Sequence, residues 1–356
     1  MDDAADATGV RFSVTGALGT VTLDRPHALN ALTHRMVIEI ASQLDTWEAD
    51  PSIERVLLEG AGDRAFCAGG DIVGIYRDAV GGGNATEQFW RDEYTLNARI
   101  ARYPKPVVTF MDGIVLGGGV GLGAHASHRV VTETSSVGMP EPTIGFVPDV
   151  GGTWLLSHAP GELGTRLALT AGTTDAAGAI HLGLADVLVP HERLAALREA
   201  LATTDADEAL DAVRGEPGHP SITDDQALLD ECFDGDDVIQ MLARLRRNGR
   251  DEIADTIESK SPSALVLTLA SLRRARDLPD LEAALVQEFR VSVRCLGLPD
   301  LAEGIRAQVI DKDRTPRWNP AALADVDADV LGTFFDPLPN DLQLPDDRLP
   351  PRKDAP

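Results

Sequence analysis

The sequence predicts an α/β protein in which a core of alternating strands and helices is followed by a helical C-terminal unit. Short β-branched and apolar segments, bounded by glycine and proline, alternate with helical apolar spacing as far as about residue 205. Beyond that point only helical spacing continues. Hydrophobic residues make up 43% of the 356 residues and charged residues 25%, which allows a buried core and excludes disorder as the main state.

The first elements are a β meander and a helix. Residues 10–24 alternate β-branched side chains around a glycine turn, and residues 33–48 have helical apolar spacing behind Thr33, which can cap the first turn. The expected inward-facing residues of this helix are Met36, Ile38, Ile40, Leu44 and Trp47. Further strands are expected at 55–60, 106–111, 128–133, 135–141 and 185–190, with a helix after the glycines of 117–123.

The C-terminal part is expected to be helical and to end in an acidic arm. Apolar spacing predicts helices near 223–232, 236–247, 263–274, 280–296 and 299–309. From residue 331 onward the chain is rich in proline and acidic residues, which is typical of an extended or partly disordered segment. We therefore expect a core at 8–205, a helical unit at 206–330 and a tail at 331–356.

Charge and apolar patterning restrict the partners and the compartment. With 57 acidic against 32 basic residues the net charge is -25, which argues against broad binding to nucleic acid or to an anionic membrane. No apolar run approaches the roughly 20 residues that cross a bilayer, and the N-terminus is acidic where a signal peptide is basic. The three cysteines are far apart and odd in number, which favours free thiols. The sequence predicts a cytoplasmic protein without nucleic-acid or membrane partners.

Two glycine-rich corners follow predicted strands. The run at 117–123 does not match the spacing of a dinucleotide-binding loop, and no acidic residue ends a following strand at the required distance. Alternatively, bare backbone at a helix start can direct N–H donors at a developing oxyanion, while close packing of the helix on a sheet explains some of the glycines in either case. The second corner, at 66–71, also lies between a strand and a helix. One N–H from each corner would make a two-donor hole for a carbonyl oxygen.

Two carboxylates lie in an apolar segment further along the chain. Glu141 and Asp149 are eight residues apart, and burial of such groups raises their pKa, so that they can divide the roles of general base and general acid. The alternative is that both are solvated loop residues or helix caps. His125 and His128 lack a matching cluster of metal ligands, so we expect no metal site and favour a packing role for them.

Several motifs resemble one family. FCAGGD, DGIVLGGGVGL and MPEPTIGFVPDVGG are similar to segments of the crotonase (enoyl-CoA hydratase/isomerase) superfamily, and more narrowly of its 3-hydroxyisobutyryl-CoA hydrolase branch. The resemblance extends to VTLDRPHALNALTHRMV, FWRDEYTLN, SKSPSAL and AEGIRAQVIDKDRTPRWNP, and covers about residues 10–325. It implies a crotonase-like ββα spiral core.

The resemblance also implies an acyl-CoA site. Matching positions put the oxyanion donors on the backbone N–H groups of Gly70 and Gly118. Hydratases of the superfamily carry one catalytic glutamate at the position of Gly121, whereas the hydrolase branch pairs Glu141 with Asp149. The implied reaction is hydrolysis of a short 3-hydroxyacyl-CoA thioester, with (S)-3-hydroxyisobutyryl-CoA of valine breakdown as the best candidate. Glu141 would attack the carbonyl to form an anhydride or activate a water, and Asp149 would manage the proton.

Three further residues are candidates for substrate binding. Glu93 matches a family glutamate that would accept a hydrogen bond from the substrate hydroxyl, the alternative being an exposed helix residue. Arg25 and Arg64 are candidates for pairing with the CoA phosphates, the alternative being solvated surface arginines. No cofactor is expected, since CoA is part of the substrate, and self-association into a homo-oligomer stays open. The competing functions are an enoyl-CoA hydratase or isomerase and a non-catalytic acyl-CoA-binding protein.

Overall fold

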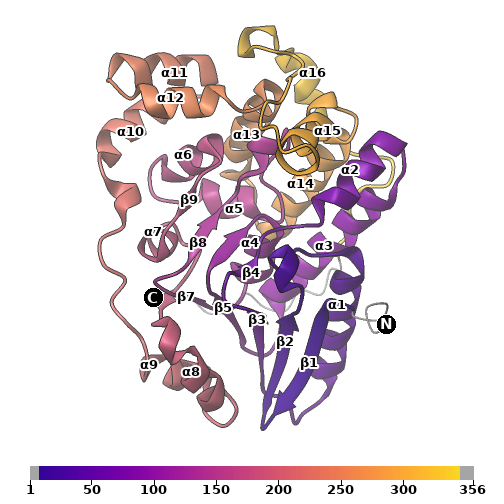
Figure 1. Ribbon diagram of the computed structural model, residues 1–356, viewed down its shortest axis with the longest axis vertical. Helices are drawn as coiled ribbons and strands as arrows, with labels where there is room; N and C mark the ends of the chain where they lie inside the picture. Colours follow the sequence, from indigo (N-terminus) through magenta and orange to yellow (C-terminus); the bar gives the residue numbers. More distant parts are fainter. Residues whose placement is uncertain (1–7, 345–356) are drawn as a thin grey trace.

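The computed structural model describes residues 8–344, which form two β-sheets surrounded by helices (Figure 1). The larger sheet is parallel except for the antiparallel β1–β2 hairpin at its edge. Its strands, in spatial order, are β1 (Val10–Thr15), β2 (Leu18–Leu23), β3 (Arg55–Gly60), β5 (Val107–Met111), β7 (His128–Val131) and β10 (Val187–Leu188).

The smaller sheet has four strands, three of which directly follow a strand of the larger sheet. Its order is β4 (Ala65–Cys67), β6 (Ile114–Leu116), β8 (Ser136–Gly138) and β9 (Thr173–Thr174). Three successive passes of the chain therefore each give one strand to each sheet, in the pairs β3 with β4, β5 with β6, and β7 with β8. This repeated pattern of two strands followed by helical structure confirms the expected ββα spiral.

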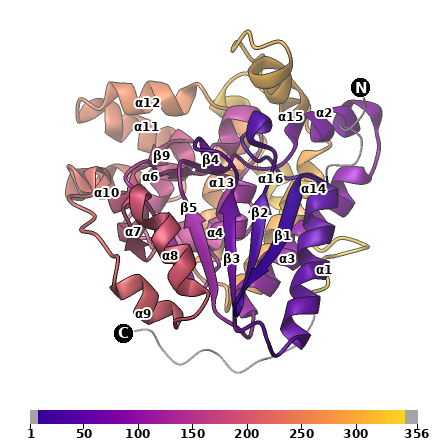
Figure 2. The ribbon, with the colours of Figure 1, turned by 60° about the horizontal axis from the view of Figure 1, so that its bottom comes forward.

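Helices cover the sheets, and after residue 205 helices are the only regular elements of the described chain (Figure 2). The helices of the first part are α1 (His34–Ala49), α2 (Ile72–Gly81), α3 (Ala85–Arg102), α4 (Gly118–Gly123), α5 (Gly152–Ser157), α6 (Leu163–Thr170), α7 (Ala176–His181) and α8 (Leu194–Leu201). Those of the second part are α9 (Ala206–Asp211), α10 (Gln226–Phe233), α11 (Val238–Arg247), α12 (Asp251–Glu258), α13 (Pro262–Ala275), α14 (Leu281–Cys295), α15 (Pro299–Ile305) and α16 (Ala328–Gly332). No helix among the described residues is both long and apolar enough to cross a membrane.

Helix α1 confirms the predicted N-terminal cap but differs from the prediction in one of its buried residues. The Thr33 hydroxyl accepts a hydrogen bond from the Met36 N–H, so the predicted cap is confirmed. Ile38, however, is 51% exposed, and Val37 is fully buried in its place. A period of 3.6 residues puts position 37 on the same face as Ile40 and Leu44, while position 38 falls outside that face.

Other differences lie at element ends. The strand expected at 135–141 stops at Gly138, and Glu141 begins a 3₁₀ turn, Glu141–Ile144. The helix expected at 299–309 ends at Ile305 and continues as a π-helical segment. The helix expected after the glycines consists only of the six residues of α4, so His125 follows its end and His128 begins strand β7.

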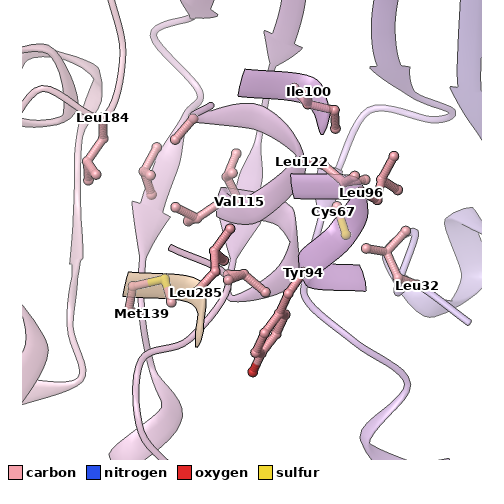
Figure 3. Packing of buried hydrophobic residues seen from close by; sticks show 14 of the residues in the cluster. Leu32, Cys67, Tyr94, Leu96, Ile100, Val115, Leu122, Met139, Leu184 and Leu285 are labelled. Carbon is pink, nitrogen blue, oxygen red and sulfur yellow. The ribbon is translucent and has the colours of Figure 1, made fainter. Parts of the chain in front are cut away.

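One apolar core joins the spiral to the C-terminal helices. Buried residues of the strands and of α3 cluster with Leu285 and Phe289 of α14 and Ile305 of α15. Figure 3 shows part of this cluster, with Leu285 among the buried residues of the spiral. The unit proposed at 206–330 is thus continuous with the core in packing, and its boundaries stay a prediction.

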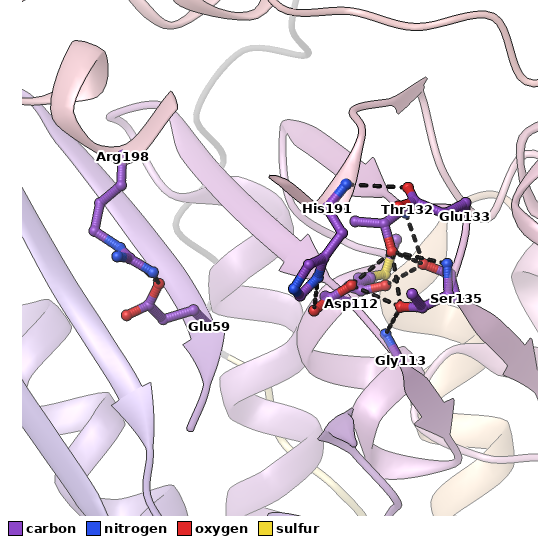
Figure 4. Close-up of polar contacts among 10 residues, drawn as sticks. Glu59, Asp112, Gly113, Thr132, Glu133, Ser135, His191 and Arg198 are labelled. Carbon is purple, nitrogen blue, oxygen red and sulfur yellow. Dashed lines mark hydrogen bonds and ion pairs between the residues drawn. The ribbon is translucent and has the colours of Figure 1, made fainter. Parts of the chain in front are cut away.

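A polar network fixes the place where the chain passes from the larger to the smaller sheet (Figure 4). Asp112, directly after β5, accepts a hydrogen bond from the Thr132 hydroxyl at 2.6 Å and contacts His191 Nδ1 at 2.8 Å. The Ser135 hydroxyl donates to the carbonyl of Met111. The hydrogen bond with Asp112 raises the pKa of His191 above its ordinary value. These contacts hold the ends of β5 and β7 together.

The described part of the acidic arm contacts α3 and α14. Residues 331–335 are helical, contrary to expectation, while 336–344 have no regular structure; residues 345–356 of the proposed tail lie outside the described range. The carboxylate of Asp341 pairs with Arg290 of α14 at 2.5 Å, and Arg91 of α3 donates to the Asp341 carbonyl at 3.0 Å. We name residues 336–344 the strap.

Asp341→Ala should destabilise the protein by about 1–3 kcal/mol, because it leaves the half-buried guanidinium of Arg290 without its partner. The urea midpoint of the variant, compared with wild type, measures this. Asp336→Ala is the matched control, since Asp336 is exposed. Equal midpoints for the two variants would contradict a stabilising role of the ion pair.

Candidate active site

The two glycine corners meet at one edge of the smaller sheet. The first lies between β4 and α2, and the second lies between β6 and α4. Because β4 and β6 are parallel neighbours, their carboxyl ends lie at the same edge. A Cβ added to Gly69 would lie 3.4 Å from the Leu116 carbonyl oxygen and 3.9 Å from the Gly118 nitrogen. These are ordinary van der Waals distances, so the two corners lie side by side, and it is the φ of +106° at Gly69 that favours glycine there.

The predicted donors, Gly70 and Gly118, both line the resulting cavity. Gly118 is the first residue of α4, a position whose N–H has no acceptor within the helix. Within residues 8–344, neither amide donates a hydrogen bond to another group of the protein. Gly117 has φ +50° and ψ -117°, a conformation that favours glycine and turns the chain into the helix. Two unused backbone donors thus belong to residues that line one cavity.

The cavity holds about 280 Å³ and has mostly apolar walls. Ile72 and Ile75 of α2, Trp90 of α3, and Leu301 and Ile305 of α15 contribute to these walls. The carboxyl groups of Glu93, Glu141 and Asp149 reach the same cavity. Larger hollows of about 610 and 540 Å³ exist elsewhere on the described chain, but none of the three carboxyl groups lines them. We take the smaller cavity as the site because the polar groups converge there.

The three carboxyl groups are buried. Glu93 is 2% exposed, Glu141 6% and Asp149 5%, which rules out the alternatives of a surface helix residue and of solvated loop residues. Oε1 of Glu93 and Oε2 of Glu141 have no hydrogen-bond partner in the described structure. A Cβ on Gly118 would lie 2.6 Å from Oε1 of Glu93, and a Cβ on Gly117 would lie 2.6 Å from Oε1 of Glu141. The carboxyl groups therefore flank the amide donors closely.

Burial dominates the electrostatics of this cluster. Loss of water raises the pKa of Glu93 and of Glu141 well above the ordinary value, and the negative charge of Asp149 raises each further. Burial also raises the pKa of Asp149, to about 7, against the opposing effect of a hydrogen bond from Tyr94. The three groups cannot all be ionised together near neutral pH, so protons are shared among them.

Tyr94, Ser292 and Glu288 were not identified from the sequence as site residues. The Tyr94 hydroxyl lies 2.7 Å from Oδ2 of Asp149 and 2.9 Å from the hydroxyl of Ser292. Glu288 accepts hydrogen bonds from the backbone just after Asp149. Tyr94 follows Glu93 in the segment FWRDEYTLN, which resembles the family. Ser292 and Glu288 lie in α14, where no sequence motif indicates a site.

The position of Gly121 has no room for a side chain. A Cβ there would lie 2.6 Å from Cβ of Val150 and 2.9 Å from Nδ2 of Asn97. Val150 itself has φ +52°, which is strained for a β-branched residue. Val150, the residue after Asp149, therefore packs directly against Gly121. A glutamate side chain at position 121 has no space in this arrangement.

The two arginine candidates lie near the early loops but differ in availability. Arg25 donates from Nη1 to the Ala31 carbonyl oxygen, and its Nη2 lies 3.8 Å from Asp71. Arg64 is exposed, and its side chain has no partner among residues 8–344. Neither lines the cavity itself. In the described range, no cluster of three or more His, Cys, Asp or Glu side chains could hold a metal ion.

Comparison with characterised sequences gives one family. The model described as enoyl-CoA hydratase/isomerase matches residues 18–335. A relative from Mus musculus named 3-hydroxyisobutyryl-CoA hydrolase, mitochondrial, is 37% identical over 347 residues, which cover 94% of this chain and 90% of the relative. The Homo sapiens protein of the same name is 36% identical, with 94% of this chain and 90% of the relative covered.

Solved structures agree in fold. One described as a carnitinyl-CoA dehydratase from Mycobacterium thermoresistibile is 48% identical with a TM-score of 0.91, covering 94% of this chain and 98% of the other. One described as an enoyl-CoA hydratase from Rhodobacter sphaeroides 2.4.1 is 40% identical with a TM-score of 0.89, covering 94% of this chain and 100% of the other. These matches confirm the resemblance seen in the motifs, and this chain belongs to the enoyl-CoA hydratase/isomerase family.

Proposed function

We propose that the protein hydrolyses a short 3-hydroxyacyl-CoA thioester, with 3-hydroxyisobutyryl-CoA as the best candidate, to the free hydroxy acid and CoA. The observation that carries this proposal is the convergence of buried Glu141 and Asp149 on two unused amide donors, at a site that cannot accept a carboxylate at position 121. The names of the curated relatives support the substrate, and a place in valine degradation is part of the proposal.

The amide donors would activate the thioester. With the carbonyl oxygen between the N–H groups of Gly70 and Gly118, negative charge that develops on this oxygen is stabilised where the donors are already oriented. One such donor typically contributes about 2.7–4 kcal/mol to transition-state stabilisation. This polarisation comes from the backbone, so the proposal includes no resident cofactor.

Glu141 and Asp149 would complete the cleavage. In one route the Glu141 carboxylate attacks the carbonyl carbon, the C–S bond breaks, and water then hydrolyses the mixed anhydride. In the other route Glu141 takes a proton from a water that attacks the same carbon. In the anhydride route, protonated Asp149 gives its proton to the departing sulfur and then, as a carboxylate, takes a proton from the water that hydrolyses the anhydride. In the water route, protonated Asp149 again gives its proton to the sulfur, and the proton that Glu141 took from the water returns to Asp149. Because its pKa is raised to about 7, Asp149 can both donate and accept a proton near neutral pH.

Glu93 would select the substrate hydroxyl. Its Oε1 is buried, has no partner within the described residues, and lies beside Gly118. A hydroxyl on the β carbon of the acyl chain could donate to this oxygen, whereas an acyl group without the hydroxyl would leave it unsatisfied. For the CoA phosphates, Arg64 is the more available cation, since Arg25 already donates to the Ala31 carbonyl.

Compartment and assembly remain predictions. The sequence favours the cytoplasm, whereas the relatives from Mus musculus and Homo sapiens are named as mitochondrial. Acyl-CoA is the partner that the proposed reaction requires. Homo-oligomer formation and the lack of nucleic-acid and membrane partners rest on the sequence alone.

A hydratase is the second candidate, because two similar solved structures are described as a dehydratase and a hydratase. Addition of water to a double bond in the manner of those enzymes uses a second glutamate, at the position that Gly121 occupies. The crowding around Gly121 argues against this reaction. A non-catalytic acyl-CoA-binding protein would have no need of two buried carboxyl groups beside the amide donors.

A panel of acyl-CoA thioesters, assayed with a thiol reagent, tests the function. We expect thiol release from 3-hydroxyisobutyryl-CoA and 3-hydroxypropionyl-CoA, and release from isobutyryl-CoA lower by on the order of 100-fold or more in kcat/KM. Loss of the double-bond absorbance of crotonyl-CoA without thiol release would favour the hydratase. Tight binding without either reaction would favour a binding protein.

Glu93→Met should narrow the preference for the hydroxylated substrate, because methionine has similar length but does not pair with the hydroxyl. The ratio of kcat/KM for 3-hydroxyisobutyryl-CoA to that for isobutyryl-CoA measures the effect. Glu93→Gln is the matched comparison and should keep most of the preference, since its amide oxygen still accepts. An unchanged ratio in Glu93→Met would remove Glu93 from substrate selection.

Glu141→Ala should abolish thiol release and leave CoA binding nearly intact, because the carboxylate acts on the acyl carbon and not on the nucleotide. Asp149→Asn should slow hydrolysis sharply at nearly equal size, since the amide does not exchange a proton. Steady-state kinetics and calorimetric titration with CoA measure the two effects. Exposed Glu192 provides the control Glu192→Ala. Wild-type turnover in Glu141→Ala would exclude this residue from the mechanism.

Gly121→Ala should reduce turnover at least about 10-fold and destabilise the fold by roughly 1–3 kcal/mol, because the new methyl group displaces Val150 and with it Asp149. The double variant with Val150→Gly should recover part of both losses, since glycine removes the opposing Cβ and accepts φ +52°. Gly332→Ala, at a site with open space, is the control. Turnover in Gly121→Ala equal to that of the control would contradict this packing argument.

A further inference from the structure

One face of α14 contacts the segment that carries Asp149. Glu288 and Ser292 are four residues apart, so they lie on the same side of the helix. Glu288 is 1% exposed and Ser292 is fully buried. Glu288 bonds to the backbone that follows Asp149, and Ser292 bonds to Tyr94, which bonds to the Asp149 side chain. One helix thus holds both the backbone and the side chain of this segment.

The backbone contact fixes the turn after Asp149. Oε2 of Glu288 accepts from the Gly151 N–H at 2.6 Å, and Oε1 accepts from the Thr153 N–H at 2.8 Å and from its hydroxyl at 2.5 Å. Gly151 has φ +81° and precedes α5, so these N–H groups have no acceptors of their own in that short helix. Glu288 therefore acts as a cap supplied from another part of the chain.

In the hydrogen bonds that join Ser292, Tyr94 and Asp149, the donor of each bond is defined. The Tyr94 hydroxyl has one proton, which it donates to Oδ2 of Asp149, so Ser292 must be the donor in its own bond with Tyr94. Burial raises the pKa of Tyr94 well above its ordinary value, which keeps this proton on the hydroxyl. The Tyr94 ring meets the Phe289 ring edge-on at 6.2 Å. In Figure 3 the ring lies by the apolar cluster and its hydroxyl points away from it.

We propose that Tyr94 and Ser292 are positioning residues that orient Asp149 and favour its ionised form in the hydrolysis proposed above. The inference rests on that proposed function for its kinetic consequences, but the contacts exist in the free protein. Tyr94 occupies Oδ2 of Asp149, a residue that lines the cavity. Ser292, by donating to the tyrosine oxygen, strengthens the tyrosine as a donor.

Several other groups act on Asp149. The titratable side chains that face it or its segment are Glu93, Tyr94, Glu141, His125, Glu288 and Cys295. Among the described residues, the Tyr94 hydroxyl is the side-chain donor that reaches the Asp149 carboxylate. Because a hydrogen bond to the charged form lowers the pKa, loss of this donor should raise the pKa of Asp149 further above about 7.

Tyr94→Phe tests the inference. We expect kcat for the hydroxyacyl-CoA to fall roughly 10- to 100-fold, corresponding to loss of one hydrogen bond to a charged group, with KM changed less than about 2-fold. The pKa assigned to Asp149 in the pH dependence of kcat should move to higher pH. Ser292→Ala should shift it in the same direction by less, since Tyr94 still donates.

Matched variants separate positioning from general loss of packing. Tyr103→Phe removes a buried tyrosine hydroxyl that donates to the Leu44 carbonyl, and Ser271→Ala removes a buried serine hydroxyl without a partner in the described structure. Both controls should leave the pH dependence unchanged. An equal fall in kcat for Tyr94→Phe and Tyr103→Phe, with no movement of the pKa, would overturn the inference.

A direct titration keeps the test independent of turnover. The ¹³C shift of the Asp149 carboxyl carbon, assigned in aspartate-labelled protein by its absence in Asp149→Asn, reports the ionisation of this group in the free enzyme. A higher pKa in Tyr94→Phe than in wild type supports the inference, and the same pKa in both refutes it. If wild type released no thiol from any thioester, the proposed function would fail while this titration would still decide the role of Tyr94.

Discussion

The burial of three carboxyl groups around one small apolar cavity is the constraint on which the rest of the structure depends. Taking an ionised carboxylate out of water costs several kcal/mol, and each ionised neighbour adds repulsion. Within residues 8–344 none of the three is paired with a cation. The protein therefore stabilises negative charge with hydrogen-bond donors, and it does so unequally: Asp149 receives the Tyr94 hydroxyl, while oxygens of Glu93 and Glu141 remain without partners.

The spiral arrangement supplies the other donors. Each pass of the chain ends a strand of the smaller sheet at the same edge, so the two glycine corners come together with their N–H groups free. The C-terminal helices then exclude water: α15 forms one wall of the cavity and α14 holds the segment of Asp149 from behind. The strap joins α3 and α14 on the outside through Arg91 and Arg290. The helical unit is thus part of the site and not an appendage to it.

At the proposed site, hydrolysis and hydration would differ in which acids surround the two amide donors. Any reaction that places negative charge on a carbonyl oxygen can use two such amides. The fold therefore does not determine the reaction, and neither does the similarity of this chain to a structure described as a hydratase. In this chain Val150 and Asn97 fill the space beside Gly121. The strained backbone of Val150, next to Asp149, is held by that contact and by the hydrogen bond between its carbonyl and His125.

The sequence by itself determined the features that short segments encode: the capped helix after Thr33, the glycine corners, the pair Glu141 and Asp149, and the family resemblance that implied the spiral. The prediction that Ile38 faces inward was wrong, because the burial of a side chain depends on its neighbours in space. Only the tertiary structure decided how Asp149 is held, because Tyr94 is 55 residues away from it and Ser292 is 198 residues from Tyr94. Contacts over such separations leave no period or spacing in the sequence, and burial, which determines the ionisation of each carboxyl group, exists only once the helices have closed over the sheet.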